Sequence, residues 1–392
     1  MIRLANYFKL LFSFLKDRGV LNFFLLGFCI LIMYKGYDQM KYYLIILLLA
    51  SLAVQYIFLL RKSYVFYLLR FGLITALLFE IFFGYLNKKN AVIEPTTITD
   101  NWYIKDSVLG WKFNRNQTNI KSILVNGNDT IYNVSYSSDS VGRRIDIEDS
   151  NVNVKTKHAI FLGCSYTFGL GLNNDATFPS LFQQKEGEYQ SYNYGFSGYG
   201  PHQVALLFSQ GADVINKRTV HQDSGFALYS YMADHPTRVY GGSSYIPWGG
   251  TSPDVYIEND QLLIKQRSKF RNRVINLFNI SATLKYFDVQ YYYPNTENFA
   301  KRFADIINYS ANQYWENFPA GNFYVGLYPQ IQNEYTWLKY LNKKIKVIEV
   351  PLPPDYLKNS AAYLIDPVYD PHPTKKMNDF YIDYITKNMK NN

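Results

Sequence analysis

The hydrophobic positions divide the chain into two parts with different patterns. Three apolar runs occupy residues 20–34, 42–60 and 65–85, and Arg70 and Glu80 are the only charged residues inside them. A membrane-spanning helix needs about 20 apolar residues, so the second and third runs are long enough and the first is short. Beyond residue 100, short apolar runs alternate with polar and glycine-rich stretches. The pattern predicts an N-terminal membrane region followed by a separate folded part.

Residues 1–87 are therefore interpreted as a membrane anchor, and the polar residues 88–100 as a linker. Ahead of the first run, one helical face at residues 4–15 is apolar, which is typical of a helix lying in the membrane surface. A cleaved signal peptide is the competing interpretation of residues 1–36, but no small-residue cleavage site follows the apolar run. A buried bundle of soluble helices is a further alternative. Glu80 is costly in lipid, so we expect it to face a neighbouring helix or the membrane interface, unless it has a function.

The distribution of charge favours membrane topology over nucleic-acid binding. The formal net charge is +9, of which residues 1–90 contribute +8 through eleven Lys and Arg and three acids. The basic residues flank the apolar runs, as the positive-inside rule requires of cytoplasmic segments. The N-terminus is then cytoplasmic. The chain is predicted to be an integral protein of the cytoplasmic membrane, and three crossings place the residues after the third apolar run on the outer side. The two cysteines, Cys29 and Cys164, lie in unlike surroundings and predict neither a disulfide nor a zinc site.

After the linker, the pattern predicts a β-rich segment over residues 101–154 and an α/β domain over 155–392. The Asn126-Gly127 pair between two apolar stretches is typical of a β-hairpin. Later strands alternate with helices, which predicts a parallel sheet covered on both faces. The predicted strands are 158–162, 191–194, 226–231, 322–327 and 346–350, and the predicted helices include 299–317 and 334–342.

The first candidate for chemistry follows the first of these strands. The sequence Gly163-Cys164-Ser165 places a serine where a strand ends and a helix begins. Amides at the start of a helix favour negative charge, which a tetrahedral oxyanion carries. The spacing differs from the Gly-x-Ser-x-Gly turn of the α/β-hydrolases. A serine that only caps the helix is the alternative interpretation.

A general base for that serine is predicted near the C-terminus, in Asp370-Pro371-His372-Pro373. A serine needs an adjacent base to act as a nucleophile, and an acid must orient that base. Of the five histidines, His372 alone lies in a proline-flanked loop with an acid two residues before it. We expect His158 to begin a strand and to have an ordinary surface role. An exposed polar turn is the alternative for residues 370–373.

A glycine-rich loop follows the second strand, from Asn193 to Pro201. Its backbone amides could donate to an oxyanion, although such a loop is also an ordinary turn. Together and in this order, the three segments resemble the blocks of the SGNH/GDSL hydrolase family. The resemblance covers residues 155–385 and implies a three-layer α/β/α fold with a flavodoxin-like parallel sheet. It also implies that Ser165 is the nucleophile, His372 the base and Asp370 the acid, with the Ser165 and Gly198 amides in the oxyanion hole.

Three departures from the family pattern affect these assignments. Cys164 replaces the acid that usually precedes the serine, and one residue instead of two separates Asp370 from His372. The family's third block carries an Asn as an oxyanion donor, but the strand at 226–231 leads into Asp234-His235. An ionised Asp cannot donate a hydrogen bond, whereas His can, so His235 is the predicted second donor. We expect Asp234 and Tyr199 to contact the substrate.

The resulting hypothesis is a membrane-anchored serine esterase acting on O-acetyl or O-acyl groups of an envelope glycan or a lipid, without metal or other cofactor. If a sugar hydroxyl accepts the acyl group, the chain is an O-acyltransferase with an acyl-donor partner in the membrane. A catalytically inactive module that binds polysaccharide is the third hypothesis. Cys164 as nucleophile, and a metal site of Asp234, His235, Asp370 and His372, are weaker alternatives. No nucleotide-binding loop or nucleic-acid partner is predicted.

Overall fold

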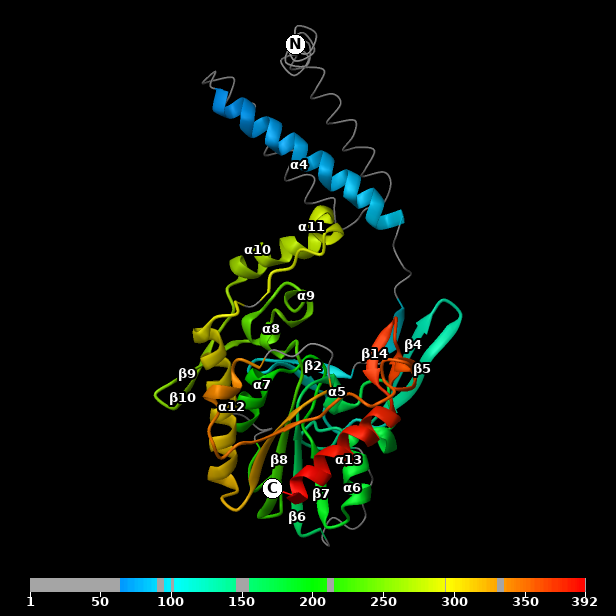
Figure 1. Ribbon diagram of the computed structural model, residues 1–392, viewed down its shortest axis with the longest axis vertical. Helices are drawn as coiled ribbons and strands as arrows, with labels where there is room; N and C mark the ends of the chain where they lie inside the picture. Colours follow the sequence, from blue (N-terminus) through cyan, green and yellow to red (C-terminus); the bar gives the residue numbers. More distant parts are fainter. Residues whose placement is uncertain are drawn as a thin grey trace. The chain divides into compact units, whose positions relative to one another are not determined.

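The computed structural model describes residues 64–89, 95–99, 102–145, 155–209, 215–292, 294–329 and 335–391. The chain divides into two compact units, one of residues 1–91 and 274–290 and the other of residues 92–273 and 291–392. The predicted surface helix and the first two apolar runs lie outside the described residues. Figure 1 labels the elements of both units.

In the first unit, the third apolar run forms helix α4 (Tyr64–Lys89), and α11 (Ala282–Tyr286) packs against it. Glu80 is buried, and its carboxylate accepts hydrogen bonds from the Ser281 hydroxyl at 2.6 Å and the Ala282 amide at 2.7 Å. These groups begin α11, where backbone amides have no partner within the helix. The prediction that Glu80 faces a neighbouring helix is confirmed.

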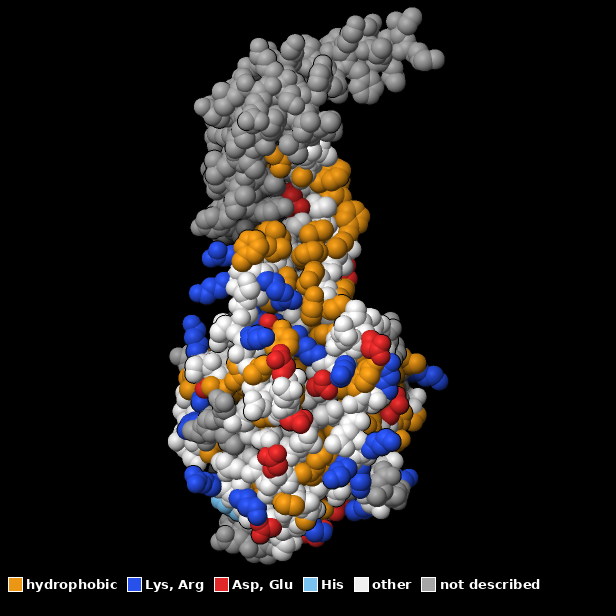
Figure 2. Space-filling model, turned by 90° about the vertical axis from the view of Figure 1, so that its left-hand side faces the viewer, with side chains coloured by type: hydrophobic (Ala, Val, Ile, Leu, Met, Phe, Trp, Pro, Cys, Tyr) orange, Lys and Arg blue, Asp and Glu red, His pale blue; other side chains and the backbone are white. Residues whose placement is uncertain are grey.

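The contact between α4 and α11 is completed by aromatic side chains, because the Phe83 ring lies 4.6 Å from that of Tyr286 and 5.0 Å from that of Phe287. Other apolar side chains of α4 are exposed, and Figure 2 shows hydrophobic side chains gathered on this part of the surface. They are Leu78, Phe79, Phe82 and Tyr85. Within the described residues, no helix is both long and apolar enough to cross a membrane.

The second unit is built on a five-stranded parallel sheet in the order β12-β11-β8-β6-β7. Along the chain these strands run in the order 6, 7, 8, 11, 12, so the first strand lies between the second and the third. This is the flavodoxin-like order, and it confirms the predicted parallel α/β sheet. The strands are β6 (Lys157–Leu162), β7 (Tyr189–Asn193), β8 (Ser224–Tyr231), β11 (Asn322–Leu327) and β12 (Lys346–Glu349).

Helices cover both faces of this sheet (Figure 1). Along β6, Ala159 and Phe161 belong to the core under α6 (Phe178–Lys185) and α13 (Lys375–Asn391), while Ile160 and Leu162 belong to the core under α7 (Pro201–Ser209) and α12 (Glu297–Asn317). Side chains alternate between faces along a strand, so a continuous apolar run fills both cores. The predicted three-layer arrangement is present in the second unit.

The β-rich segment shares its core with the α/β domain. A three-stranded antiparallel sheet is formed by β1 (Thr96–Thr99), β4 (Ile120–Asn126) and β5 (Asp129–Tyr136), and β2 (Tyr103–Asp106) pairs with β3 (Gly110–Phe113). The β4–β5 hairpin was predicted, but its two-residue loop is Gly127-Asn128. Phe113 stacks on Phe196 with ring centroids 5.6 Å apart. The predicted boundary at 154/155 therefore separates no compact units, and β1 occupies part of the predicted linker.

The remaining elements surround the carboxyl ends of the strands or connect the larger ones. A predicted helix at 334–342 is wrong, because over the described residues 335–342 only the single 3-10 turn Leu338–Tyr340 forms. The Asn308 side chain donates to the Tyr340 carbonyl and accepts from the Asn342 amide, which holds this backbone to α12. The other elements are α5 (Ser165–Phe168), α8 (His235–Tyr240), α9 (Ile246–Gly249), β9 (Asp254–Glu258), β10 (Gln261–Lys265), α10 (Lys269–Ile280), β13 (Leu364–Asp366), β14 (Asp370–Pro373), and the 3-10 turns Asn174–Ala176 and Ser360–Ala362.

Candidate active site

Ser165 begins the short helix α5 directly after strand β6. Between them, Gly163 has φ +156°, and a Cβ at this position would lie 2.2 Å from the Thr167 hydroxyl oxygen. Only glycine fits such a close approach, so Gly163 permits the sharp turn that places Ser165 at the carboxyl edge of the sheet. The Ser165 side chain is nearly buried, with 6% of the residue exposed.

His372 and Asp370 lie together on β14, and the imidazole reaches Ser165 across 207 residues of sequence. His372 Nε2 is 2.8 Å from Ser165 Oγ, and Nδ1 contacts the Asp370 carboxylate. The same carboxylate oxygen accepts the His372 backbone amide at 3.2 Å. In the neutral imidazole, Nδ1–H donates to Asp370 and Nε2 accepts from the serine hydroxyl. The structure thus brings together the three residues predicted as a catalytic triad, despite the short spacing between acid and base.

Tyr166 holds the loop that carries His372, a role that the sequence did not indicate. Its hydroxyl donates to the Pro371 carbonyl at 2.9 Å, and its ring lies 5.1 Å from the His372 ring. Tyr328 packs against the ring of Tyr166. Burial raises the pKa of Tyr166 above its ordinary value, so the phenol keeps its proton and remains a donor.

The glycine-rich loop after β7 packs against the nucleophile turn. Asn193 accepts the Gly195 amide at 3.0 Å and donates to the Thr167 carbonyl at 3.1 Å, and the Phe196 amide donates to the Gly163 carbonyl at 3.3 Å. Gly198 follows two residues after Phe196 and has φ +79°, a conformation that favours glycine. The loop thereby lies against the turn before Ser165 at Phe196, two residues ahead of Gly198.

Arg144 of the β-rich segment fixes the other side of the nucleophile turn. Its guanidinium is buried and donates to the carbonyls of Phe168 at 2.9 Å, Gly169 at 2.7 Å and Leu172 at 2.7 Å. It also stacks over the ring of Tyr136 at 4.6 Å. Sequence reasoning missed this residue, because it lies in a segment interpreted as a separate lead-in.

His235, which was predicted as the second oxyanion donor, has no exposed surface. Its imidazole is completely buried, and Nδ1 accepts from the Met232 amide at 3.3 Å and contacts the Tyr229 hydroxyl at 2.6 Å. Burial lowers its pKa to about 3, so the ring is neutral. Because Nδ1 is an acceptor, the ring proton is on Nε2, which is also buried. This corrects the prediction, since a buried donor cannot reach a substrate oxygen.

The two residues predicted to contact the substrate differ in exposure. Tyr199 is buried, and its hydroxyl donates to the Trp111 carbonyl at 2.9 Å, so its phenol does not reach a substrate. The Asp234 side chain is 54% exposed, and Arg238 donates to its Oδ2 from Nε at 2.9 Å. Burial raises the pKa of Asp234, but the Arg238 charge outweighs this effect and holds the pKa below its ordinary value. Asp234 is therefore an accessible, ionised group.

The position of Cys164 disfavours the alternative in which it is the nucleophile. Cys164 caps α5 and is buried, and burial raises the pKa of its thiol, which disfavours the reactive thiolate. Among the described residues, no three His, Cys, Asp or Glu side chains are grouped to hold a metal ion.

His158 was expected at the surface but is completely buried, with Nδ1 2.9 Å from the Gln222 carbonyl and Nε2 2.8 Å from the Tyr314 hydroxyl.

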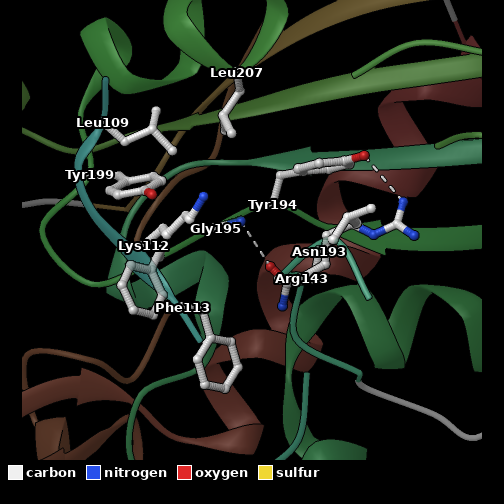
Figure 3. A pocket seen from close by; sticks show the side chains of 12 residues that line it. Leu109, Lys112, Phe113, Arg143, Asn193, Tyr194, Gly195, Tyr199 and Leu207 are labelled. Atoms are coloured by element: carbon white, nitrogen blue, oxygen red, sulfur yellow. Dashed lines mark hydrogen bonds between the residues drawn. The ribbon is translucent and has the colours of Figure 1, made fainter. Parts of the chain in front are cut away.

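A small cavity of about 30 Å³ lies behind the glycine-rich loop (Figure 3). Lys112 and Phe113 of β3 line one side, and Tyr194 lines another, with its hydroxyl accepting a hydrogen bond from Arg143 at 3.1 Å. Ser165 and His372 are not among its lining residues. The cavity has room for little more than a water molecule, so it is not a substrate pocket.

No family model and no curated protein matches this chain. Solved structures similar to it include an acetyl xylan esterase from Butyrivibrio proteoclasticus, with 10% identity, 62% of this chain and 66% of that chain covered, and a TM-score of 0.36. They also include a lipolytic protein of the G-D-S-L family from Desulfitobacterium hafniense, with 14% identity, 59% and 98% covered, and a TM-score of 0.30.

A third similar structure is an extracellular lipase from Streptomyces rimosus, with 10% identity, 59% of this chain and 99% of that chain covered, and a TM-score of 0.33. The chain spans just under two thirds of the length of the acetyl xylan esterase. These similarities are too low to carry a functional argument, so the function below rests on the geometry of this chain.

Proposed function

We propose that this chain is a serine esterase that cleaves acyl esters of an envelope glycan or a lipid. One observation carries the proposal, namely the hydrogen-bond chain from the Ser165 hydroxyl through His372 to the buried Asp370. If Ser165 only capped a helix, or if residues 370–373 formed only an exposed turn, Ser165 and His372 would not need to contact each other. They are hydrogen-bonded although they lie 207 positions apart. Acyl transfer through a serine needs this arrangement of nucleophile, base and orienting acid.

In the proposed reaction, His372 Nε2 takes the Ser165 proton as Oγ attacks the ester carbonyl. The backbone amides of Ser165 and Gly198 donate to the oxyanion, and Asp370 stabilises the imidazolium that forms. His372 then returns the proton to the leaving alcohol, and an acyl-enzyme remains. Water, deprotonated by His372, attacks the acyl group, and Ser165 recovers its proton as the acid is released.

The test is hydrolysis of p-nitrophenyl acetate by the full chain in mild detergent. Ser165→Ala and His372→Ala should each lose at least about 10³-fold in kcat, because triad members act as a unit. Ser209→Ala, on α7, and His221→Ala, on the exposed loop before β8, are matched controls that should retain activity. Equal activity in the wild type and in both triad variants would refute the proposal. Transfer of the acetyl group to an added sugar in place of water would identify a transferase.

We further propose that the N-terminal part anchors the enzyme in a membrane, with the α/β unit outside. Support comes from the three apolar runs, the basic residues that flank them, and the exposed apolar side chains of α4. The full chain should remain in the membrane pellet after extraction with sodium carbonate at high pH. Release into the supernatant would contradict the anchor. Protease added to intact cells or right-side-out vesicles should cleave the α/β unit only if it lies outside.

A further inference from the structure

Trp248 is a large aromatic residue that remains 51% exposed although several contacts hold it in place. Its Nε1–H donates to the Ser244 carbonyl at 2.9 Å. Its ring packs edge-on against Tyr245, with centroids 4.7 Å apart, and against Trp111, at 6.2 Å. About half of the Trp248 side chain therefore remains accessible to solvent, and the hydrogen bond and ring contacts hold this exposed ring surface in place.

This ring surface adjoins Gly198, the residue whose amide we assign to the oxyanion hole. A Cβ added at Gly198 would lie 2.3 Å from Trp248 Cζ3 and 3.0 Å from Trp111 Cζ2. The indole edge thus lies directly on the Gly198 backbone, and no other residue type fits between them. A substrate whose carbonyl oxygen points at Gly198 would place the neighbouring part of the molecule beside Trp248.

Polar groups that suit hydroxyls lie on the same side of the loop. The Arg238 guanidinium is 5.7 Å from the Trp248 ring centroid, and it donates to the carbonyl of Tyr199, the residue after Gly198, at 2.6 Å. Arg238 also holds the exposed Asp234 carboxylate, and both of its contacts are with Oδ2. Asp234 Oδ1 receives neither of these contacts, which leaves it as a hydrogen-bond acceptor at the surface.

We propose that Trp248 and Asp234 form a subsite for a pyranose ring that carries the ester. The apolar C–H face of the sugar would stack on the indole, and a hydroxyl would donate to Asp234. The inference rests on the proposed esterase function and narrows its substrate to an acylated glycan. An acyl lipid fits less well, since a hydrocarbon chain lying on Trp248 would offer Asp234 no hydrogen-bond donor in place of water.

The test compares kcat/KM of the full chain for three esters, namely an O-acetylated methyl pyranoside, p-nitrophenyl acetate and p-nitrophenyl decanoate. The ratio of the pyranoside to p-nitrophenyl acetate should fall about tenfold in Trp248→Ala, the order expected for one aromatic stacking contact. Trp248→Phe, which keeps a smaller ring, should give an intermediate ratio and guards against local unfolding. Asp234→Asn should lower the same ratio. Phe270→Ala removes an even more exposed aromatic residue from α10 and should leave the ratio unchanged.

The outcomes separate the subsite from the esterase itself. Hydrolysis of p-nitrophenyl acetate with an unaltered ratio in Trp248→Ala and Asp234→Asn would overturn the subsite and leave the esterase standing. A selective loss with the decanoate would replace the sugar with a lipid and also overturn it. If the wild type hydrolyses no ester, saturation-transfer NMR with an unacylated methyl pyranoside decides. A saturation-transfer signal from the pyranoside that disappears in Trp248→Ala would support the subsite, although the esterase proposal would have failed. No such signal in the wild type would refute both proposals.

Discussion

His158 makes the stability of the α/β unit depend on pH. It is completely buried on β6 beneath α12, and both ring nitrogens are hydrogen-bonded when the ring is neutral. The Gln222 carbonyl can only accept, so Nδ1 carries the proton, and Nε2 then accepts from the Tyr314 hydroxyl. A second proton on Nε2 would require that hydroxyl to turn away and would leave a charge in the core. Burial accordingly lowers the pKa of His158 from 6.5 to about 4.

The size of the effect follows from these two pKa values. Between pH 6.5 and pH 4, the unfolded chain binds a proton at this position that the folded chain does not. Stability therefore falls as the pH falls through this window. Linkage gives a loss of about 2 kcal/mol between pH 8 and pH 5 from His158 alone, rising to about 3 kcal/mol below pH 4.

Urea unfolding of the full chain in mild detergent, followed by tryptophan fluorescence, measures this loss. All five tryptophans lie in the α/β unit, so the signal reports on that unit. His158→Gln keeps a donor and an acceptor but does not titrate, and His158→Phe fills the space without either. Both variants should show about 2 kcal/mol less difference between pH 8 and pH 5 than the wild type. The reasoning is refuted if the wild type and both variants lose the same free energy over this interval.

Three further predictions concern the site and the first unit. Asp370→Asn should lower kcat for p-nitrophenyl acetate by about 10³–10⁴-fold with little change in KM, because an amide favours the wrong His372 tautomer. A loss of less than tenfold would show that Asp370 is not the orienting acid. Tyr166→Phe should remove the hydrogen bond to the Pro371 carbonyl and lower kcat by about tenfold; an unchanged kcat would show that β14 holds His372 unaided. Glu80→Ala should leave the first amides of α11 without an acceptor and destabilise its packing on α4 by about 3 kcal/mol. Hydrogen exchange over residues 281–287 should then be faster, and Glu80→Gln should have a smaller effect. Equal exchange in the wild type and both variants would contradict the role of Glu80.

The residues of the triad could be predicted because each stands at a local landmark. A buried strand, a glycine and a serine in succession place Ser165 at the sheet edge, and a proline-flanked loop marks His372. The parallel sheet likewise follows from a regular alternation of strands and helices, whereas its flavodoxin-like strand order was implied only by the family resemblance. These features depend on residues close together in the sequence, where periodicity and turn chemistry act.

The surroundings of the triad could not be predicted in the same way. Trp248 meets Gly198 fifty positions earlier in the chain, and Glu80 meets Ser281 across 201 positions. His235 follows a strand as a donor would, but its ring turns inward to Tyr229, which no local pattern indicates. Burial and hydrogen-bond partners of this kind are set by how distant segments pack, and one sequence carries no direct sign of that packing.

The most direct measurement is the mass of the full chain after treatment with a fluorophosphonate, which reacts with an activated serine. The account predicts one added phosphonyl group, found on Ser165 by peptide mass spectrometry, and none in His372→Ala. Labelling of another residue, or equal labelling of Ser165 in the wild type and in His372→Ala, would contradict the claim that Ser165 is a nucleophile activated by His372.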